Sequence, residues 1–593
     1  MTRLAQQLAR LAADRRSLWL VLALALAVAL PTLDAGLIGD DVAHQRFVAA
    51  QLESPAASPE AGAVRWWDMF VLVEGDAERT LGLRRAGRYP WWVDPDLRIR
   101  FFRPLSVATH YVDHWLARAL WPGTVWPMHL HSVAWYLLAC ALVWGLARRL
   151  GSSAAVGTVA ALWFALCYAH LSPVGWLAHR NATIATVFML LAVGAHHRWR
   201  AHGWGSGAVL GPVSLLAALL SAELGLAGFG LLLAYALVLD RGPGQSWVGP
   251  LASLLVYVAV IVGWRLVYDA LGYGAIGSGA YLDPIGDPLA YLAALPERLG
   301  WLLVLRFGAP LIPAVPSWLW WMTSASRAGV WLVFIAACMR GRVSARAARV
   351  TCFGLLGATI GLIPMTASIP GDRLLIPTSF GLAMVFGELI NAWLLDGDGD
   401  GDSDARPGPF ARAAACWAVV IALVIAPLAW LIHGAALDEL RFSGDRPPHG
   451  AALPNAGLSR KALVIVHGRD HMSASHLPAA RAAWGLEAPN FSWILHTGPR
   501  EPEVVRIDAR TLELRDPSGF VREPFAAYWR SVARRPFAVG DEVRTLDYVA
   551  RVMAVNRGRP TAVRFIFRAR LEHSSFVLAW WNGADYVAWS APR

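Results

Sequence analysis

The apolar run Ser17-Leu-Trp-Leu-Val-Leu-Ala-Leu-Ala-Leu-Ala-Val-Ala-Leu30 is followed, a few residues later, by Leu37-Ile-Gly-Asp-Asp-Val-Ala-His44. An apolar segment of about 20 residues is long enough to cross a bilayer as a helix. Adjacent carboxylates repel each other and are costly beside lipid, so packing alone does not explain Asp40 and Asp41. They are suited to act as general base, as metal ligands, or as both. The plain alternative is an acidic, solvated start of a loop.

The rest of the chain repeats the first apolar run many times. Of 593 residues, 56% are hydrophobic and only 16% are charged, a balance well outside that of soluble domains. We predict a polytopic α-helical membrane protein with about 11–13 transmembrane helices. The stretch 287–322 is either a helix pair or a membrane-embedded segment broken by prolines. The other expected spans lie near residues 17–36, 127–147, 153–170, 181–197, 206–221, 224–240, 248–268, 327–340, 350–367, 374–395 and 411–433.

Charge distribution predicts the orientation. The N-terminal arginines also precede signal peptides, but no small-residue cleavage site comes before the acidic pair, so an uncleaved first span is expected. Lys and Arg place the N-terminus in the cytoplasm and residues 37–126 outside as the first outer loop. The formal charge of +11 suits anionic lipid, and no nucleic-acid motif is present. The five cysteines lie in or beside apolar segments, so no disulfide framework is expected in the loops or the tail.

The composition changes near residue 436, which predicts a membrane domain over 1–435 and a soluble, β-rich domain over 436–593. Expected strands are 462–466, 504–508, 563–567 and 576–580, and Asn582-Gly583 predicts a hairpin. The last span would deliver this domain to the extracytoplasmic side, the periplasm for a bacterial inner membrane. Its His467-Gly-Arg-Asp-His471 has no nucleophile elbow beside it, which leaves acceptor binding or packing onto the membrane domain. The acidic run 396–404 is interpreted as a flexible linker rather than a calcium loop.

Ionisable side chains gather on the predicted outer side. A single His or Arg at a helix end usually extends to the lipid headgroups. Intramembrane or interfacial ionisable groups are nevertheless candidates for function, and a convergent set predicts a site for an anionic, partly lipidic substrate. The members are Asp40, Asp41, His44, His129, His131, His170, His179, Arg180, Glu223, Asp372 and Arg373.

Several short motifs resemble one family. They are Phe102-Arg-Pro-Leu-Ser-Val107, His129-Leu-His131, Ala161–His170 with Trp176-Leu-Ala-His-Arg180, Leu219-Leu-Ser-Ala-Glu223 and Gly371–Gly381. In this order they resemble the O-mannosyltransferase-like proteins of the C-type (GT-C) membrane glycosyltransferase superfamily, which are often fused to tetratricopeptide repeats. The resemblance covers roughly residues 30–395. It departs from the family at Cys167, Ser172 and Ala222, where His, Glu and Lys are usual, and no 34-residue repeat follows.

The resemblance implies an enzyme that transfers a sugar from a polyprenyl-phosphate carrier to a protein or glycan acceptor of the cell envelope. It implies Asp40 and Asp41 as base and, in some members, metal ligands. It places His170, Arg180, Glu223 and Arg373 on the family's conserved ionisable positions. The missing lysine and acid leave the identity of the donor open.

The residue types fit this chemistry. One of Asp40 and Asp41 would take the proton of the acceptor hydroxyl, and Arg103, Arg180 and Arg373 are candidates for holding the departing phosphate. His44, His179 and Asp372 complete the expected substrate site. A divalent ion such as Mg or Mn could replace or assist the arginines, and the sequence does not show whether one binds. The alternative function is a lipid-linked-glycan transporter or a degenerate scaffold. A transporter would carry polar groups through the midplane, whereas these residues gather at one face.

Overall fold

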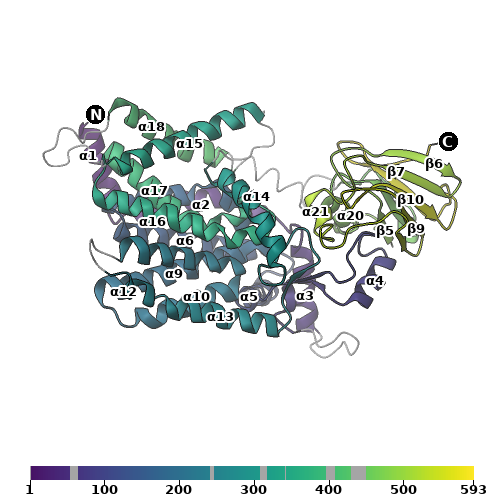
Figure 1. Cartoon of the computed structure of the whole chain (residues 1–593), viewed down its shortest axis with the longest axis horizontal. Helices are drawn as coiled ribbons and strands as arrows, with labels where there is room; N and C mark the ends of the chain where they lie inside the picture. The colour runs from purple at the N-terminus through teal and green to yellow at the C-terminus, as the bar shows by residue number, and fades with distance from the viewer. Residues whose placement is uncertain are drawn as a thin grey trace.

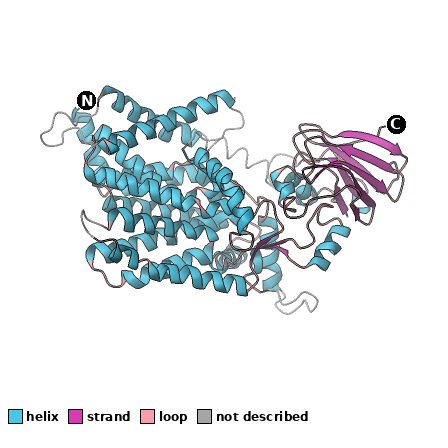
Figure 2. Ribbon diagram, viewed as in Figure 1, coloured by secondary structure: helices cyan, strands magenta, loops and turns pink. Residues whose placement is uncertain are grey.

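A computed structural model of the chain describes residues 2–592 except 54–64, 241–245, 308–316, 341, 396–407, 429, 431–448 and 490. A large helical domain occupies one end of the molecule and a smaller β-rich domain the other, with the two chain termini at opposite ends (Figures 1 and 2). The predicted class, a polytopic helical protein with a β-rich C-terminal domain, is confirmed. The predicted boundary at residue 436 and the acidic run 396–404 lie outside the described residues.

Eight described helical segments are long and apolar enough to cross a membrane, and a ninth candidate is a bent pair. Three further apolar helices, Gly207–Ser221, Glu223–Leu239 and Pro409–Val420, are shorter. These shorter helices account for most of the difference from the larger number expected from sequence. The long segments are Ser17–Asp34, Trp126–Leu150, Leu177–His202, Val248–Ala270, Pro288–Phe307, Trp321–Met339, Ala345–Ala367 and Ile376–Leu395.

The helices resolve the stretch that the sequence leaves ambiguous, and they change one expected span. The ambiguous stretch 287–322 contains α14 (Pro288–Phe307) and the start of α15 (Ser317–Met339), and α15 also includes most of the separately expected span 327–340. The expected span at 153–170 is instead bent by 58° between Ala154–Ala165 and Tyr168–Gly175. One end of the helical domain adjoins the β-rich domain, and we call it the loop end. After the bend, the following turn and the start of α9 (Arg180–His202) lie toward this end.

The first outer loop builds the surface of the loop end. Its two longer helices are α3 (Asp41–Glu53) and the amphipathic α5 (Pro104–Leu120). Between them lie α4 (Ala77–Arg85) and a small sheet in the order β1-β2-β3, formed by Val71–Glu74, Arg98–Arg100 and Gly274–Ile276. Because β3 belongs to the loop after α13 (Leu255–Ala270), this sheet ties together two segments that are far apart in the sequence.

The C-terminal domain contains two sheets. A five-stranded antiparallel sheet has the order β6-β7-β10-β9-β8, and a four-stranded sheet has the order β12-β11-β4-β5. In the second sheet β4 pairs in parallel with β5 and β11, and α20 (His471–Ala483) connects β4 to β5. The four expected strands and the hairpin at Asn582 are confirmed. The strand bounds are Ala462–His467 (β4), Phe491–Ile494 (β5), Glu503–Asp508 (β6), Thr511–Arg515 (β7), Glu542–Arg544 (β8), Tyr548–Asn556 (β9), Arg559–Phe567 (β10), Phe576–Trp581 (β11) and Tyr586–Ala588 (β12).

Two tryptophans of the first loop belong to the core of the C-terminal domain. Trp91 and Trp92 are each 2% exposed, although they follow α4 in the chain. The indole of Trp91 donates to the carbonyl of Leu495 and that of Trp92 to the carbonyl of Ala526, both at 3.0 Å. Large buried aromatic groups dominate the energetics of such contacts. The C-terminal domain is therefore anchored on the first outer loop, directly above the loop end.

Candidate functional site

Asp41 holds the start of α3 in place. Its carboxylate is 1% exposed and accepts from the backbone N–H of Ile38 at 2.9 Å and of Ala178 at 2.6 Å. Burial raises the pKa of Asp41 to about 7, and the neighbouring Asp40 acts in the same direction. With both oxygens bonded to backbone, this side chain joins the first loop to the turn before α9. Its geometry is that of a positioning residue.

Asp40 is placed differently. It is half-buried, and within the described residues no donor bonds to its carboxylate. The preceding residue, Gly39, has φ of +51°, a conformation that side chains rarely adopt. A Cβ there would lie 3.2 Å from Met472 and 3.3 Å from Trp176. The tight turn at Gly39 therefore presents Asp40 to the junction of the two domains with its oxygens free to accept a proton.

His44 lies one helical turn beyond Asp40. It is 4% exposed, and no described residue bonds to either ring nitrogen. His110 of α5 is in the same condition, with its ring centroid 6.0 Å from that of His44. Burial lowers the pKa of His44 to about 4, with Asp40 opposing and Arg103 assisting the shift. A neutral imidazole at this point is able to donate or accept a hydrogen bond. His110 was missed from sequence because a histidine on an amphipathic helix carries no signal of its own.

Arg103 and Glu223, both predicted from sequence, form an ion pair at 2.7 Å. Arg103 also stacks over Phe70 and Phe101, at 4.9 and 4.4 Å from the ring centroids. The hydroxyl of Tyr268 donates to Glu223 at 3.3 Å. The guanidinium is therefore held in a fixed place close to His44.

His179 and Arg373 join this group. His179 is half-buried and lies within electrostatic range of both Arg103 and Arg373. Arg373, in the short helix Asp372–Leu374, makes no ion pair with any described residue. Thus Asp40, His44, Arg103, His179 and Arg373 form one connected set, with Glu223 behind Arg103. We call these six residues the open cluster.

The other predicted residues lie in the protein interior. Arg180 has no exposed surface and pairs with Asp113 at 2.5 Å. It also donates to the hydroxyl of Ser132 and to the carbonyl of Met128. His131 bonds the second oxygen of Asp113 at 2.6 Å. We call Arg180, Asp113 and His131 the interior cluster.

Two further histidines have structural contacts. His170 is fully buried and bonds Ser379 at 2.7 Å and Tyr136 at 3.3 Å. His129 bonds the carbonyl of Gly36 at 2.9 Å. Neither ring is in the open cluster. Asp113 could have been found from the sequence only by knowing that a buried Arg180 requires a carboxylate partner.

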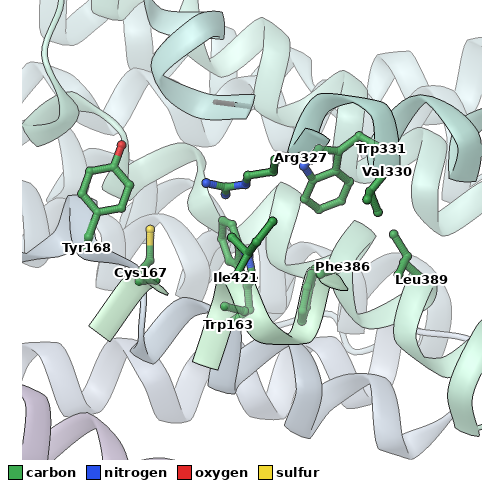
Figure 3. Close-up of a pocket in the computed structure, with 12 residues that line it drawn as sticks. Trp163, Cys167, Tyr168, Arg327, Val330, Trp331, Phe386, Leu389 and Ile421 are labelled. Atoms are coloured by element: carbon green, nitrogen blue, oxygen red, sulfur yellow. The ribbon is translucent and has the colours of Figure 1, made fainter. Parts of the chain in front are cut away.

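Behind Arg373 lies a cavity lined mainly by apolar side chains. It has a volume of about 30 Å³ and lies between the bent pair, α15, α17 (Ser379–Ile390) and the segment after α18 (Pro409–Val420). Arg327 of α15 extends into it, between Tyr168 on one side and Trp331 on the other (Figure 3). Tyr168 and Cys167 at its polar end lie within electrostatic range of Asp372, the neighbour of Arg373. The cavity therefore ends beside the open cluster.

The acidic pair offers little to a divalent ion. Asp41 uses both oxygens on backbone donors, and Glu223 is paired with Arg103. Among the described residues no three His, Cys, Asp or Glu side chains gather as metal ligands. The residues present therefore do not fit the Mg or Mn that the sequence left open.

No protein-family model and no curated protein matches the chain. Among solved structures, it is similar to the oligosaccharyltransferase AglB from Archaeoglobus fulgidus in complex with an inhibitory peptide and a dolichol-phosphate. This match has a TM-score of 0.39 and 14% identity over 81% of this chain and 65% of that one. The arabinofuranosyltransferase AftD from Mycobacteria matches with a TM-score of 0.36 and 15% identity, over 94% and 40% of the two chains. The chain thus spans less than two thirds of these structures, and a functional conclusion has to come from the site itself.

Proposed function

We propose that this protein transfers a sugar from a polyprenyl-phosphate carrier to an acceptor hydroxyl at the loop end of its membrane domain. One observation carries the proposal. A half-buried carboxylate with free oxygens, Asp40, stands at one end of a row of cationic groups. That row leads from Arg103 to Arg373, whose neighbour Asp372 lies within electrostatic range of Tyr168 and Cys167 at the end of a mainly apolar cavity.

Asp40 would act as the base. As the acceptor oxygen forms its bond to the anomeric carbon of the sugar, its proton passes to the Asp40 carboxylate. A positioned general base of this kind contributes about 10²–10⁴-fold to rate. Asp41 supports this role indirectly, because its two backbone hydrogen bonds fix the turn that presents Asp40.

The arginines would receive the leaving group. When the bond between the anomeric carbon and the phosphate oxygen breaks, its electron pair leaves with the polyprenyl phosphate, which gains negative charge. Arginine is always charged and holds phosphate oxygens bidentately. Arg373 has no carboxylate partner among the described residues, so it is the stronger candidate. Arg103, already paired with Glu223, would contribute its field and its remaining N–H groups.

The start of the isoprenoid chain would pack against the apolar side chains around this small cavity. Its walls include Trp163, Trp331, Phe386 and Ile421, which suit a hydrocarbon. Arg327, in the lining of this cavity, supplies positive charge that would attract the phosphate. This arrangement suits a multi-pass enzyme of a bacterial inner membrane whose loop end and C-terminal domain face the extracytoplasmic side.

The first experiment is a search for the donor. Native mass spectrometry of the purified protein should detect a co-purified polyprenyl phosphate or lipid-linked sugar. Arg373→Gln should weaken retention about 10-fold or more, since a hydrogen bond to a charged group contributes roughly 1.5–3 kcal/mol. Arg340→Gln, which changes an exposed arginine at the end of α15, is the matched control. Equal retention in both variants would contradict the assignment of Arg373.

Transfer itself is measured with membranes that contain the wild-type chain and a panel of polyprenyl-phosphate sugars. Sugar must appear on an acceptor in an Asp40-dependent way. Lipid retention without any transfer, in wild type as well as variants, would favour the transporter or scaffold.

A further inference from the structure

Aromatic side chains from the C-terminal domain and from the loops of the membrane domain meet near Asp40. Tyr528 contacts Tyr281 and Trp529, with ring centroids 5.7 and 5.3 Å away, and Trp529 contacts Tyr89 at 4.8 Å. All four residues are half-buried. We call Tyr89, Tyr281, Tyr528 and Trp529 the aromatic roof.

The roof lies next to the proposed base. Met472, the second residue of α20, packs on Gly39, where an added Cβ would be 3.2 Å from its terminal methyl carbon. The hydroxyl of Tyr528 lies within electrostatic range of the Asp40 carboxylate and of the hydroxyls of Tyr281 and Tyr89. Burial raises the pKa of Tyr528 well above its usual range, so this hydroxyl keeps its proton.

The segment that carries Tyr528 is fixed by hydrogen bonds to the loops of the membrane domain. The carbonyl of Ala527 accepts from the N–H of Gly279 and that of Trp529 from the N–H of Asp94, both at 2.9 Å. The N–H of Ser531 donates to the carbonyl of Gly277 at 2.7 Å. With Trp92 bonded to Ala526 as well, the roof is organised before any ligand arrives.

We infer that the aromatic roof is the acceptor subsite, and that the acceptor is a carbohydrate whose ring stacks on Tyr528 with a hydroxyl directed at Asp40. The inference rests on the proposed function for the identity of the reaction. A sugar ring has an apolar C–H face that suits an aromatic ring and hydroxyls that suit a carboxylate and a phenol. The donor side is elsewhere, because Arg373 and the cavity lie beyond His179.

A peptide acceptor is the alternative occupant, and the test separates the two. The full chain in nanodiscs is titrated with soluble tetrasaccharides of glucose, mannose, galactose and N-acetylglucosamine, and with octapeptides containing Ser, Thr or Asn. Binding is followed by saturation-transfer NMR. At least one tetrasaccharide should bind the wild type, and Tyr528→Ala should weaken that binding roughly 2- to 10-fold, as expected for one aromatic contact.

Variants close to Tyr528 provide the controls. Phe525→Ala removes an exposed ring, 38% accessible, from the same segment and should leave saccharide binding unchanged. Tyr528→Phe should retain most of the binding, because the ring remains. If Tyr528→Ala does not fold, Tyr528→Leu, which removes the aromatic ring but keeps an apolar side chain, provides the same comparison.

Three outcomes would overturn the inference. They are no saccharide binding by the wild type, equal binding by Tyr528→Ala, and Tyr528-dependent binding of peptides alone. A fourth comparison separates acceptor from donor, since Tyr528→Ala should bind polyprenyl-phosphate glucose and polyprenyl-phosphate mannose as the wild type does. Weaker binding of these lipids would assign the roof to the donor instead. Tyr528-dependent saccharide binding without any lipid binding would count against the proposed function and leave the saccharide subsite standing.

Discussion

The interior cluster and the open cluster contain the same types of residue but differ in the burial and pairing of their charges. In the interior cluster, Arg180 and Asp113 have 0% and 2% of their side chains exposed, and each charge has a partner. In the open cluster, Asp40 and Arg373 are half-buried, and within the described residues neither charge has a direct partner. Placing charges close to lipid is costly, so pairing explains the first cluster. The second requires another reason, and a charged substrate supplies one.

The largest expected effect concerns the difference between Asp40 and Asp41. Asp40→Asn should lower transfer about 10²–10⁴-fold, because an amide of the same shape does not accept a proton. Its melting temperature should stay near that of the wild type, since no described donor bonds to the lost charge. The measurement is sugar transfer by purified protein, together with a thermal unfolding curve. Full activity in Asp40→Asn would remove the base from the mechanism.

The second prediction compares the stability of one arginine variant from each cluster. Arg180→Gln leaves Asp113 buried beside only His131, and breaking a buried pair typically costs about 3–5 kcal/mol. Arg373→Gln removes a cation that no described carboxylate neutralises, so its stability should change little. Thermal unfolding of both variants in the same detergent tests this contrast. Equal destabilisation would mean that Arg373 also has a structural role.

A third prediction separates positioning from catalysis at Asp41. Asp41→Ala leaves the N–H groups of Ile38 and Ala178 without acceptors, and each buried unsatisfied group costs about 1–3 kcal/mol. Both stability and transfer should therefore fall in this variant. Hydrogen exchange at residues 38 and 178 should also rise. A loss of activity without increased exchange would assign Asp41 a direct chemical role.

The sequence identified the members of the open cluster better than it identified their roles. Apolar length, charge distribution and strand alternation were enough for the helical class and for strands such as β4 and β11. Asp40, Arg103, Glu223 and Arg373 were also named in advance, because ionisable groups near lipid are rare. Burial could not be read from residue type, so Arg180 could not be distinguished from Arg373. The hydrogen bonds of Trp91 and Trp92 join segments more than 400 residues apart, and no local pattern predicts such pairs.

The smallest expected effect extends the comparison to an unpaired group of the C-terminal domain. His471 is 4% exposed, lies between Trp92 and Trp529, and has no described partner on either ring nitrogen. Burial lowers its pKa to about 3. Well above pH 6.5 the His471 ring is neutral in both the folded and the unfolded state, so its contribution to the free energy of unfolding does not change with pH. As the pH falls from about 6.5 toward 3, only the unfolded chain gains the proton, and stability is lost by at most about 1.4 kcal/mol per pH unit.

His471→Phe fills the same space between the two indoles without a titrating group. Its melting temperature should resemble that of the wild type at pH 7.5 and exceed it at pH 5, where the difference amounts to about 2 kcal/mol. Some acid sensitivity should remain, because burial also lowers the pKa of His467 and His44 to about 4. An identical fall in both proteins between pH 7.5 and 5 would show that His471 is hydrated or paired in the folded state. A domain interface that opens at Trp92 would then be the simplest explanation, and the aromatic roof would no longer be fixed above Asp40.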